Sequence, residues 1–124
     1  MEIHFVHADE GGNLAVVAVM VNESENNPEI GSLWANIPQK VHVKLALAES
    51  ANAQLLLPEN EEYYRFNGSL TTPPCSEGVT WIVMKQPIFA SSSQIDRADN
   101  NVDWSYFRRF YNFLFTWAKH AVLC

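Results

Sequence analysis

The run Ser69-Leu70-Thr71-Thr72-Pro73-Pro74 constrains the fold of this chain more than any other segment. Two consecutive prolines stiffen the backbone and remove two amide donors. Pro73 also keeps Thr72 out of the helical region. Strand-like sequence flanks the run, from Tyr63 to Phe66 and from Val79 to Lys85. The run therefore predicts a rigid loop between two strands, which serves either as a plain structural turn or as a holder for a hydroxyl and a backbone N–H.

The composition indicates one small globular domain. The chain has 124 residues, of which 48% are hydrophobic and 18% charged, and its formal net charge is -6. A negative charge argues against electrostatic binding to nucleic acid or to an anionic membrane. No apolar run approaches the ~20 residues that cross a bilayer, and no secretory signal pattern opens the sequence. Small-molecule chemistry or protein contact is the better expectation, and the sequence leaves the localisation unknown.

Strand patterns dominate the first part of the chain. Residues 2–7 alternate between two faces, and residues 14–21 form a continuous apolar, β-branched run, so the two predict a hairpin with a loop of about six residues. Pro28 suits the first turn of a short helix that continues to about Asn36. Residues 39–57 are ambiguous between strand and helix. Residues 90–103 are expected to be loop-like, with a turn of helix at Ser93–Arg97.

The last part of the chain differs in character. Its apolar residues recur at helical spacing, with Asp103 as a candidate cap, which predicts a C-terminal helix. The residues at that spacing are Trp104, Phe107, Tyr111, Leu114, Ala118 and Ala121. With Arg108, Arg109 and Lys119 this helix could bind a membrane surface, although filling part of the core is favoured. The fold class expected is mostly β with short helices (α+β).

Glu2 and His4 form the clearest candidate for chemistry on a strand. Residues i and i+2 of a strand project from the same face, so the carboxylate can contact one ring nitrogen of His4. Such a contact orients an imidazole that binds a metal through its other nitrogen. The alternative is an ordinary polar pair. His7 lies on the opposite face, where a core histidine is the simpler interpretation.

Residues 1–97 resemble the C-terminal half of an alpha-class carbonic anhydrase of the bacterial type. The similarity is carried by Glu2-Ile3-His4-Phe5-Val6-His7, Asn13-Leu14-Ala15-Val16-Val17, Leu33-Trp34, Leu56-Leu57-Pro58, Tyr63-Tyr64-Arg65 and the run from Gly68 to Trp81. The resemblance implies a partial antiparallel sheet over residues 1–97, followed by an unmatched, aromatic-rich, helical tail at 98–124. It also implies an ancestry of periplasmic or secreted proteins.

The resemblance also implies roles for individual residues. His4 matches the third zinc ligand and Glu2 its supporting carboxylate. Thr71 matches the threonine that orients zinc-bound hydroxide and receives anions or sulfonamides, and Thr72 matches its neighbour at the pocket floor. The apolar wall beside which carbon dioxide lies corresponds to Val6, Val16, Leu70, Val79 and Trp81. The implied activity is zinc-dependent reversible hydration of carbon dioxide to bicarbonate, in which zinc lowers the pKa of its bound water to about 7.

The sequence departs from the family in its metal ligands. Two of the three zinc histidines have no counterpart here, so the 124-residue chain alone is expected to be inactive, and whether it is an enzyme stays open. The alternatives are a non-catalytic carbonic-anhydrase-related binding module or a non-functional gene fragment with a misplaced start. Cys75 matches a cysteine that pairs with one near the start of the family domain, and Cys124 is a poor substitute. Self-association through an exposed sheet edge at residues 2–7 is expected.

Overall fold

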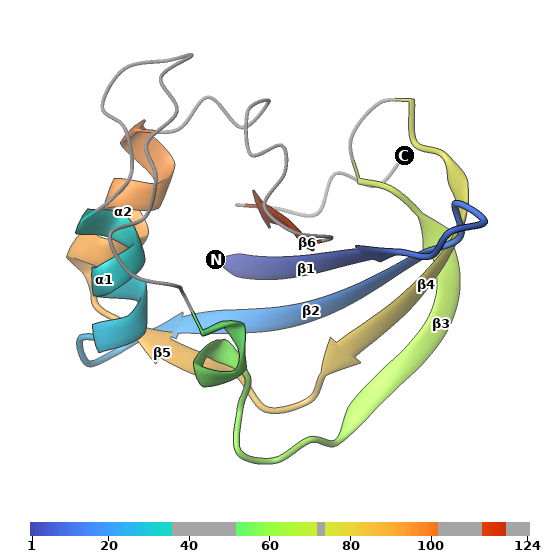
Figure 1. Ribbon diagram of the computed structural model, residues 1–124. Coiled ribbons are helices and arrows are strands. Elements are labelled where there is room, and N and C mark those ends of the chain that lie inside the picture. The colour runs from blue at the N-terminus through green and yellow to red at the C-terminus, as the bar shows by residue number, and fades with distance from the viewer. Residues whose placement is uncertain (36–51, 72–73, 102–112, 119–124) are drawn as a thin grey trace.

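The computed structural model describes residues 1–35, 52–71, 74–101 and 113–118 (Figure 1). This part of the chain is mostly β, with two short α-helices, as the sequence predicted. Its elements are β1 (Glu2–Ala8), β2 (Leu14–Glu23), α1 (Pro28–Ala35), the 3₁₀ helix η1 (Ala53–Leu56), β3 (Tyr63–Ser69), β4 (Glu77–Met84), β5 (Ile88–Ala90), α2 (Ser92–Asn101) and β6 (Phe113–Ala118). Most of the segment 39–57, which was ambiguous, lies outside the described residues.

The predicted hairpin of β1 and β2 is present. The two strands pair antiparallel from Glu2 opposite Met20 to Ala8 opposite Leu14. The carboxylate of Asp9 closes the loop, because it accepts hydrogen bonds from the backbone N–H of Asn13 at 2.8 Å and from its side-chain amide at 2.7 Å. Gly12 has a φ of 83°, which glycine adopts without a steric cost. This loop therefore fixes the register that sets the faces of both strands.

The sheet is mixed rather than antiparallel throughout. Its strand order is β3-β4-β2-β1-β6, and β5 pairs with the end of β2. β2 runs parallel to both β4 and β5, whereas β3 and β4 form an antiparallel pair on either side of the proline turn. The chain between β2 and β4 contains α1, η1 and β3, and a long connection of this kind is what parallel pairing requires. The expectation of an antiparallel sheet is corrected on this point.

The tail does not form the predicted helix over the residues that are described. Phe113–Ala118 is the strand β6, which pairs antiparallel with β1 from Glu2 opposite Ala118 to His7 opposite Phe113. Figure 1 shows β6 lying alongside β1, although the two strands are more than a hundred residues apart in the sequence. The edge at residues 2–7 is consequently paired, so the expectation that it is exposed is wrong.

The helices cover one face of the sheet at its end. Asn27 caps α1, because its side-chain oxygen accepts from the N–H groups of Glu29 and Ile30, each at 3.1 Å. The buried Gln94 of α2 holds the two helices together: its side chain bonds both backbone groups of Asn27. Its backbone oxygen accepts from the indole N–H of Trp34 at 2.7 Å. The helical turn expected at Ser93–Arg97 is part of this longer α2.

Alternate residues of the strands build two apolar clusters on opposite faces. The larger cluster contains Ile3, Phe5, Val19, Val21, Ile30, Trp34, Leu56, Met84, Ala90 and Ala98. The smaller one contains Val6, Val16, Ala18, Val79 and Trp81, with Leu14, Leu70 and Val83 packed against it. The strand register places Glu2 and His4 on the face of the smaller cluster, which we call the His4 face. The helices pack on the other face.

Candidate active site

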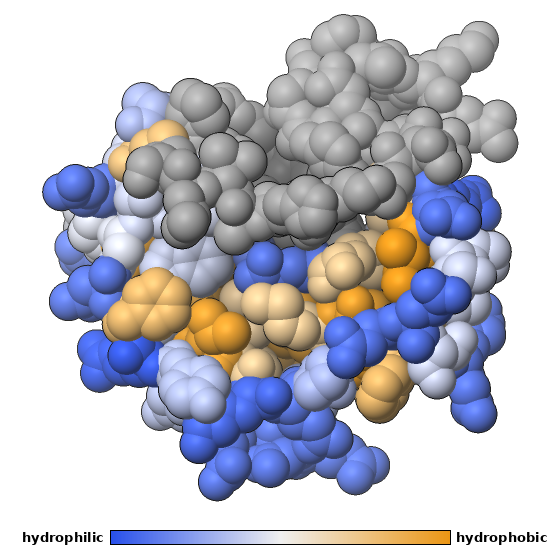
Figure 2. All heavy atoms as spheres, turned by 180° about the vertical axis from the view of Figure 1, so that it is seen from behind, coloured by the Kyte–Doolittle hydropathy of each residue, from blue (hydrophilic) through white to orange (hydrophobic). Residues whose placement is uncertain are grey.

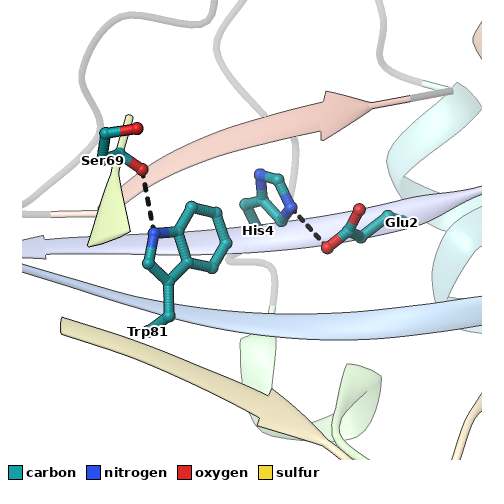
Figure 3. Close-up of polar contacts among 4 residues, drawn as sticks. All are labelled: Glu2, His4, Ser69 and Trp81. Atoms are coloured by element: carbon teal, nitrogen blue, oxygen red, sulfur yellow. Dashed lines mark hydrogen bonds and ion pairs between the residues drawn. The ribbon is translucent and has the colours of Figure 1, made fainter. Parts of the chain in front are cut away.

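Glu2 and His4 lie side by side on the His4 face of β1. Nε2 of His4 is 2.8 Å from Oε1 of Glu2, and the side chains are 2% and 12% exposed. Figure 3 shows the carboxylate directed at the imidazole along the strand. Because Nε2 is turned toward Glu2, Nδ1 is the ring nitrogen that a cation would use. The alternation of β1 in the sequence was enough to predict this arrangement.

Trp81 connects His4 to the proline turn. Its indole meets the imidazole edge-on, with the ring centroids 5.0 Å apart and the planes at 79°. The indole N–H donates to the backbone oxygen of Ser69 at 2.9 Å, as drawn in Figure 3. Ser69 is the last residue of β3, immediately before the turn. One buried side chain therefore fixes the distance between the strand that carries His4 and the loop that carries the threonines.

The structure brings the predicted apolar wall together. Val6, Val16, Val79 and Trp81 are buried in one cluster, with Leu70 packed against them. They come from β1, β2, β4 and the residue after β3, so only the tertiary fold makes them neighbours. The result is an apolar cluster packed beside a buried imidazole.

The threonine turn is described in part. Thr71 is half-buried, and the preceding residue Leu70 donates its N–H to the backbone oxygen of Ser76 at 2.9 Å, which closes the turn. Thr72 lies outside the described residues, so its predicted place at the pocket floor stays a prediction. Cys75 has a φ of 55° and is disulfide-bonded rather than a free thiol. Cys124 lies outside the described residues.

Two residues of the site were missed at the level of sequence. Phe66 stacks on Trp81 with centroids 6.3 Å apart and planes at 7°. A Cβ on Gly68 would lie 3.1 Å from Cδ1 of Trp81, so this position needs glycine for the indole to approach the strand. The register pairs Phe66 with Trp81 and Gly68 with Val79. If the strand predicted from Tyr63 to Phe66 had been extended through Gly68, the alternation of its side chains would have placed both residues on one face.

The described residues do not complete a zinc site. They contain no group of three histidine, cysteine, aspartate or glutamate side chains that could hold a metal ion. His7 projects from the opposite face of β1, and His42 and His120 lie outside the described residues. Structural and catalytic zinc sites use three or four protein ligands. The described residues supply one imidazole and its supporting carboxylate, and zinc does not fit them alone.

The family model for eukaryotic-type carbonic anhydrase matches residues 1–107, which extends past the limit at residue 97 that the sequence indicated. The chain belongs to this family. No helix in the described part of the chain is long and apolar enough to span a membrane.

Bacterial carbonic anhydrases are among the proteins to which this chain is similar in sequence. A carbonic anhydrase of Klebsiella pneumoniae is 46% identical over 95 residues, which cover 77% of this chain and 39% of the relative. A carbonic anhydrase of Pectobacterium carotovorum is 43% identical over 97 residues, which cover 78% of this chain and 40% of the relative. Among solved structures, the Photobacterium profundum alpha-carbonic anhydrase is 50% identical with a TM-score of 0.77, covering 82% of this chain and 47% of that one. The chain thus spans less than half the length of these relatives.

Proposed function

We propose that this chain supplies one wall of a site for the reversible hydration of carbon dioxide to bicarbonate. The observation that carries the proposal is the Glu2–His4 pair, buried on the same sheet face as the apolar cluster and linked through Trp81 to the threonine turn. The fold supports this proposal because residues far apart in sequence converge there. Family membership supplies the reaction class.

Each residue of the proposed site has a role that follows from its chemistry. His4 provides a nitrogen ligand for zinc, and Glu2 fixes the orientation and tautomer of its ring. Val6, Val16, Leu70, Val79 and Trp81 form the surface for carbon dioxide. Thr71 offers a hydroxyl, which both donates and accepts, together with a backbone N–H for anions or sulfonamides. One of the similar structures is a Thermovibrio ammonificans enzyme in complex with sulfanilamide, which makes this compound class the first to test as a ligand.

The 124-residue polypeptide is proposed to be inactive by itself. The described residues offer zinc one imidazole, far short of its usual coordination, and the apolar wall alone contributes no catalysis. The direct measurement is the zinc content of the dialysed chain by atomic absorption, together with stopped-flow hydration of carbon dioxide. Stoichiometric zinc or hydration above the buffer rate would contradict this part of the proposal.

A chimera tests the positive part of the proposal. In the Klebsiella pneumoniae relative, the segment that aligns with this chain would be replaced by residues 1–97. We expect the chimera to bind stoichiometric zinc and to hydrate carbon dioxide, and His4→Ala to remove both. His7→Ala is the matched control, since His7 lies on the other face of the same strand and its loss should leave zinc in place. If the folded chimera binds the same amount of zinc with and without His4→Ala, the proposal is wrong.

A non-catalytic binding module is the second candidate, and the shortage of metal donors among the described residues favours it. The two candidates differ in what the chimera does. If a folded, zinc-loaded chimera fails to hydrate carbon dioxide but still binds sulfanilamide, residues 1–97 support binding without catalysis, which is the second candidate. Hydration by the chimera excludes this second candidate for residues 1–97.

A further inference from the structure

The strand β6 occupies the outer edge of β1, which is the strand that carries His4. Six consecutive residue pairs join the two strands, and Thr116 lies directly opposite His4 in the register. On its other side β1 pairs with β2, where Ala18 is opposite His4. Every backbone group along Ile3–His7 therefore has a strand on each side, in keeping with the burial of Ile3, His4 and Phe5.

The neighbours of β1 determine what else can reach a cation at His4. Residues directly opposite each other on adjacent strands have Cβ atoms about 4.5–5.5 Å apart, a separation that two ligands of one metal ion can share. On the β2 side the positions are Val16, Ala18 and Met20, none of which carries the imidazole, thiolate or carboxylate that zinc sites use. A second imidazole, thiolate or carboxylate ligand on a neighbouring strand must come from the β6 side.

β6 brings no such donor. Its sequence is Phe113-Leu114-Phe115-Thr116-Trp117-Ala118, without histidine, cysteine, aspartate or glutamate. An edge of a sheet accepts only one strand at a time, because each of its N–H and C=O groups makes one ladder bond. A strand that carried metal ligands would have to displace β6 before it could lie beside His4.

We propose that β6 is a built-in cap that protects the β1 edge from aggregation. It is also an autoinhibitory contact, because it leaves the position beside His4 without a histidine, cysteine, aspartate or glutamate that could bind a metal ion. The inhibitory part rests on the proposed function, whereas the capping part rests on the pairing alone. An uncapped β1 would present unpaired backbone groups next to apolar side chains, which is a template for strand addition. The cap removes that edge.

The register can be tested by placing a second imidazole in β6. Thr116→His puts a histidine opposite His4, and Phe115→His places the same residue one position away, where strand alternation reverses the face. In the full chain we expect Thr116→His to bind Zn²⁺ about tenfold or more tightly than the wild type, measured by competition with a chromophoric chelator. Phe115→His should show no such gain, and His4→Ala should abolish it in the Thr116→His background. Equal gains in the two variants would overturn the pairing.

Hydrogen exchange tests the same pairing without a variant that could misfold. Along an antiparallel strand, residues alternate in the side to which their N–H and C=O groups point. The amides of Glu2–His7 therefore divide between β2 and β6. We expect all of them to exchange slowly relative to the loop at residues 9–13. If alternate β1 amides exchange as fast as that loop, β6 does not cap the edge.

Competition tests the inhibitory role. The probe is the part of the Klebsiella pneumoniae relative that precedes its aligned segment, added to the full chain as a separate polypeptide. Leu114 lies opposite Val6, whose backbone groups point away from β2 and toward β6, so Leu114→Pro weakens the cap by removing a ladder donor. Leu114→Ala is the control that loses the side chain but keeps the N–H. We expect Leu114→Pro to capture more of the probe than either Leu114→Ala or the wild type. Equal capture by all three would overturn the inhibition. The chimera described above ends before β6, so its result judges the catalytic site independently of the cap.

Discussion

At the scale of single residues, the buried His4 depends on its neighbour Glu2. A polar ring in an apolar cluster costs free energy unless polar groups compensate it. We predict that Glu2→Ala lowers the free energy of unfolding by about 1–3 kcal/mol, measured by urea denaturation. The exposed Glu61 offers the same substitution without a buried contact, and Glu61→Ala should change little. Equal losses in the two variants would mean that the 2.8 Å contact does not stabilise the chain.

Gly68 and Gly31 should respond in opposite directions to the same added methyl group. At Gly68 the methyl would lie 3.1 Å from the Trp81 ring, whereas at Gly31, inside α1, it would meet only Nε2 of Gln94 at 3.4 Å, an ordinary van der Waals distance. We predict that Gly68→Ala destabilises the chain by ~1–3 kcal/mol through crowding and alters the near-ultraviolet circular dichroism. Gly31→Ala should stabilise it by ~0.5–1 kcal/mol, because alanine favours the helix. Stabilisation by Gly68→Ala would contradict the tight contact.

At the scale of elements, the loop of the β1–β2 hairpin carries a pH-dependent contribution. Hydrogen bonds from the side chain and then the backbone of Asn13 lower the pKa of Asp9 below its ordinary value of 3.8. A group whose pKa is lowered in the folded state stabilises it above the unfolded pKa, and this stabilisation is lost as the pH falls through the folded value. We therefore predict that Asp9→Ala lowers the Tm at pH 7, with a difference that disappears in acid well below pH 3.8. Glu10→Ala, in the same loop, should show no such trend, and a deficit that persisted in acid would rule out the ionised carboxylate as the cause.

At the scale of the whole molecule, local patterns in the sequence predicted the near-neighbour structure and missed the distant pairings. Alternation in residues 2–7 placed Glu2 and His4 on one face, and the two prolines located the turn. β6 was missed because Phe113-Leu114-Phe115-Thr116-Trp117 satisfies both helical spacing and strand propensity. Its pairing with β1 joins segments more than a hundred residues apart in the numbering, and no local pattern encodes such a contact. The parallel pairing of β2 with β4 was missed for the same reason.

The His4 face also leaves large apolar side chains in contact with solvent. Met20, Tyr64 and Phe66 are 39%, 62% and 50% exposed, and the register places all three on that face. Seen from the side opposite to Figure 1, apolar side chains form a band bordered by hydrophilic ones (Figure 2). Exposed apolar patches of this kind favour association. Since β6 pairs with the β1 edge, this face replaces that edge as the surface through which we expect the chain to self-associate.

Two adjacent tyrosines lie on opposite faces of β3 and so can show which face associates. Tyr64 is on the His4 face, whereas Tyr63, 53% exposed, projects from the other side of β3. We predict that Tyr64→Glu shifts the chain toward monomer in light scattering coupled to size-exclusion chromatography, because a charge in an apolar contact must be desolvated. Tyr63→Glu adds the same charge one residue away and should leave the distribution as in the wild type. A larger shift from Tyr63→Glu would place the contact on the opposite face, and a wild-type chain that stays monomeric at every concentration would show that the exposed band does not drive association.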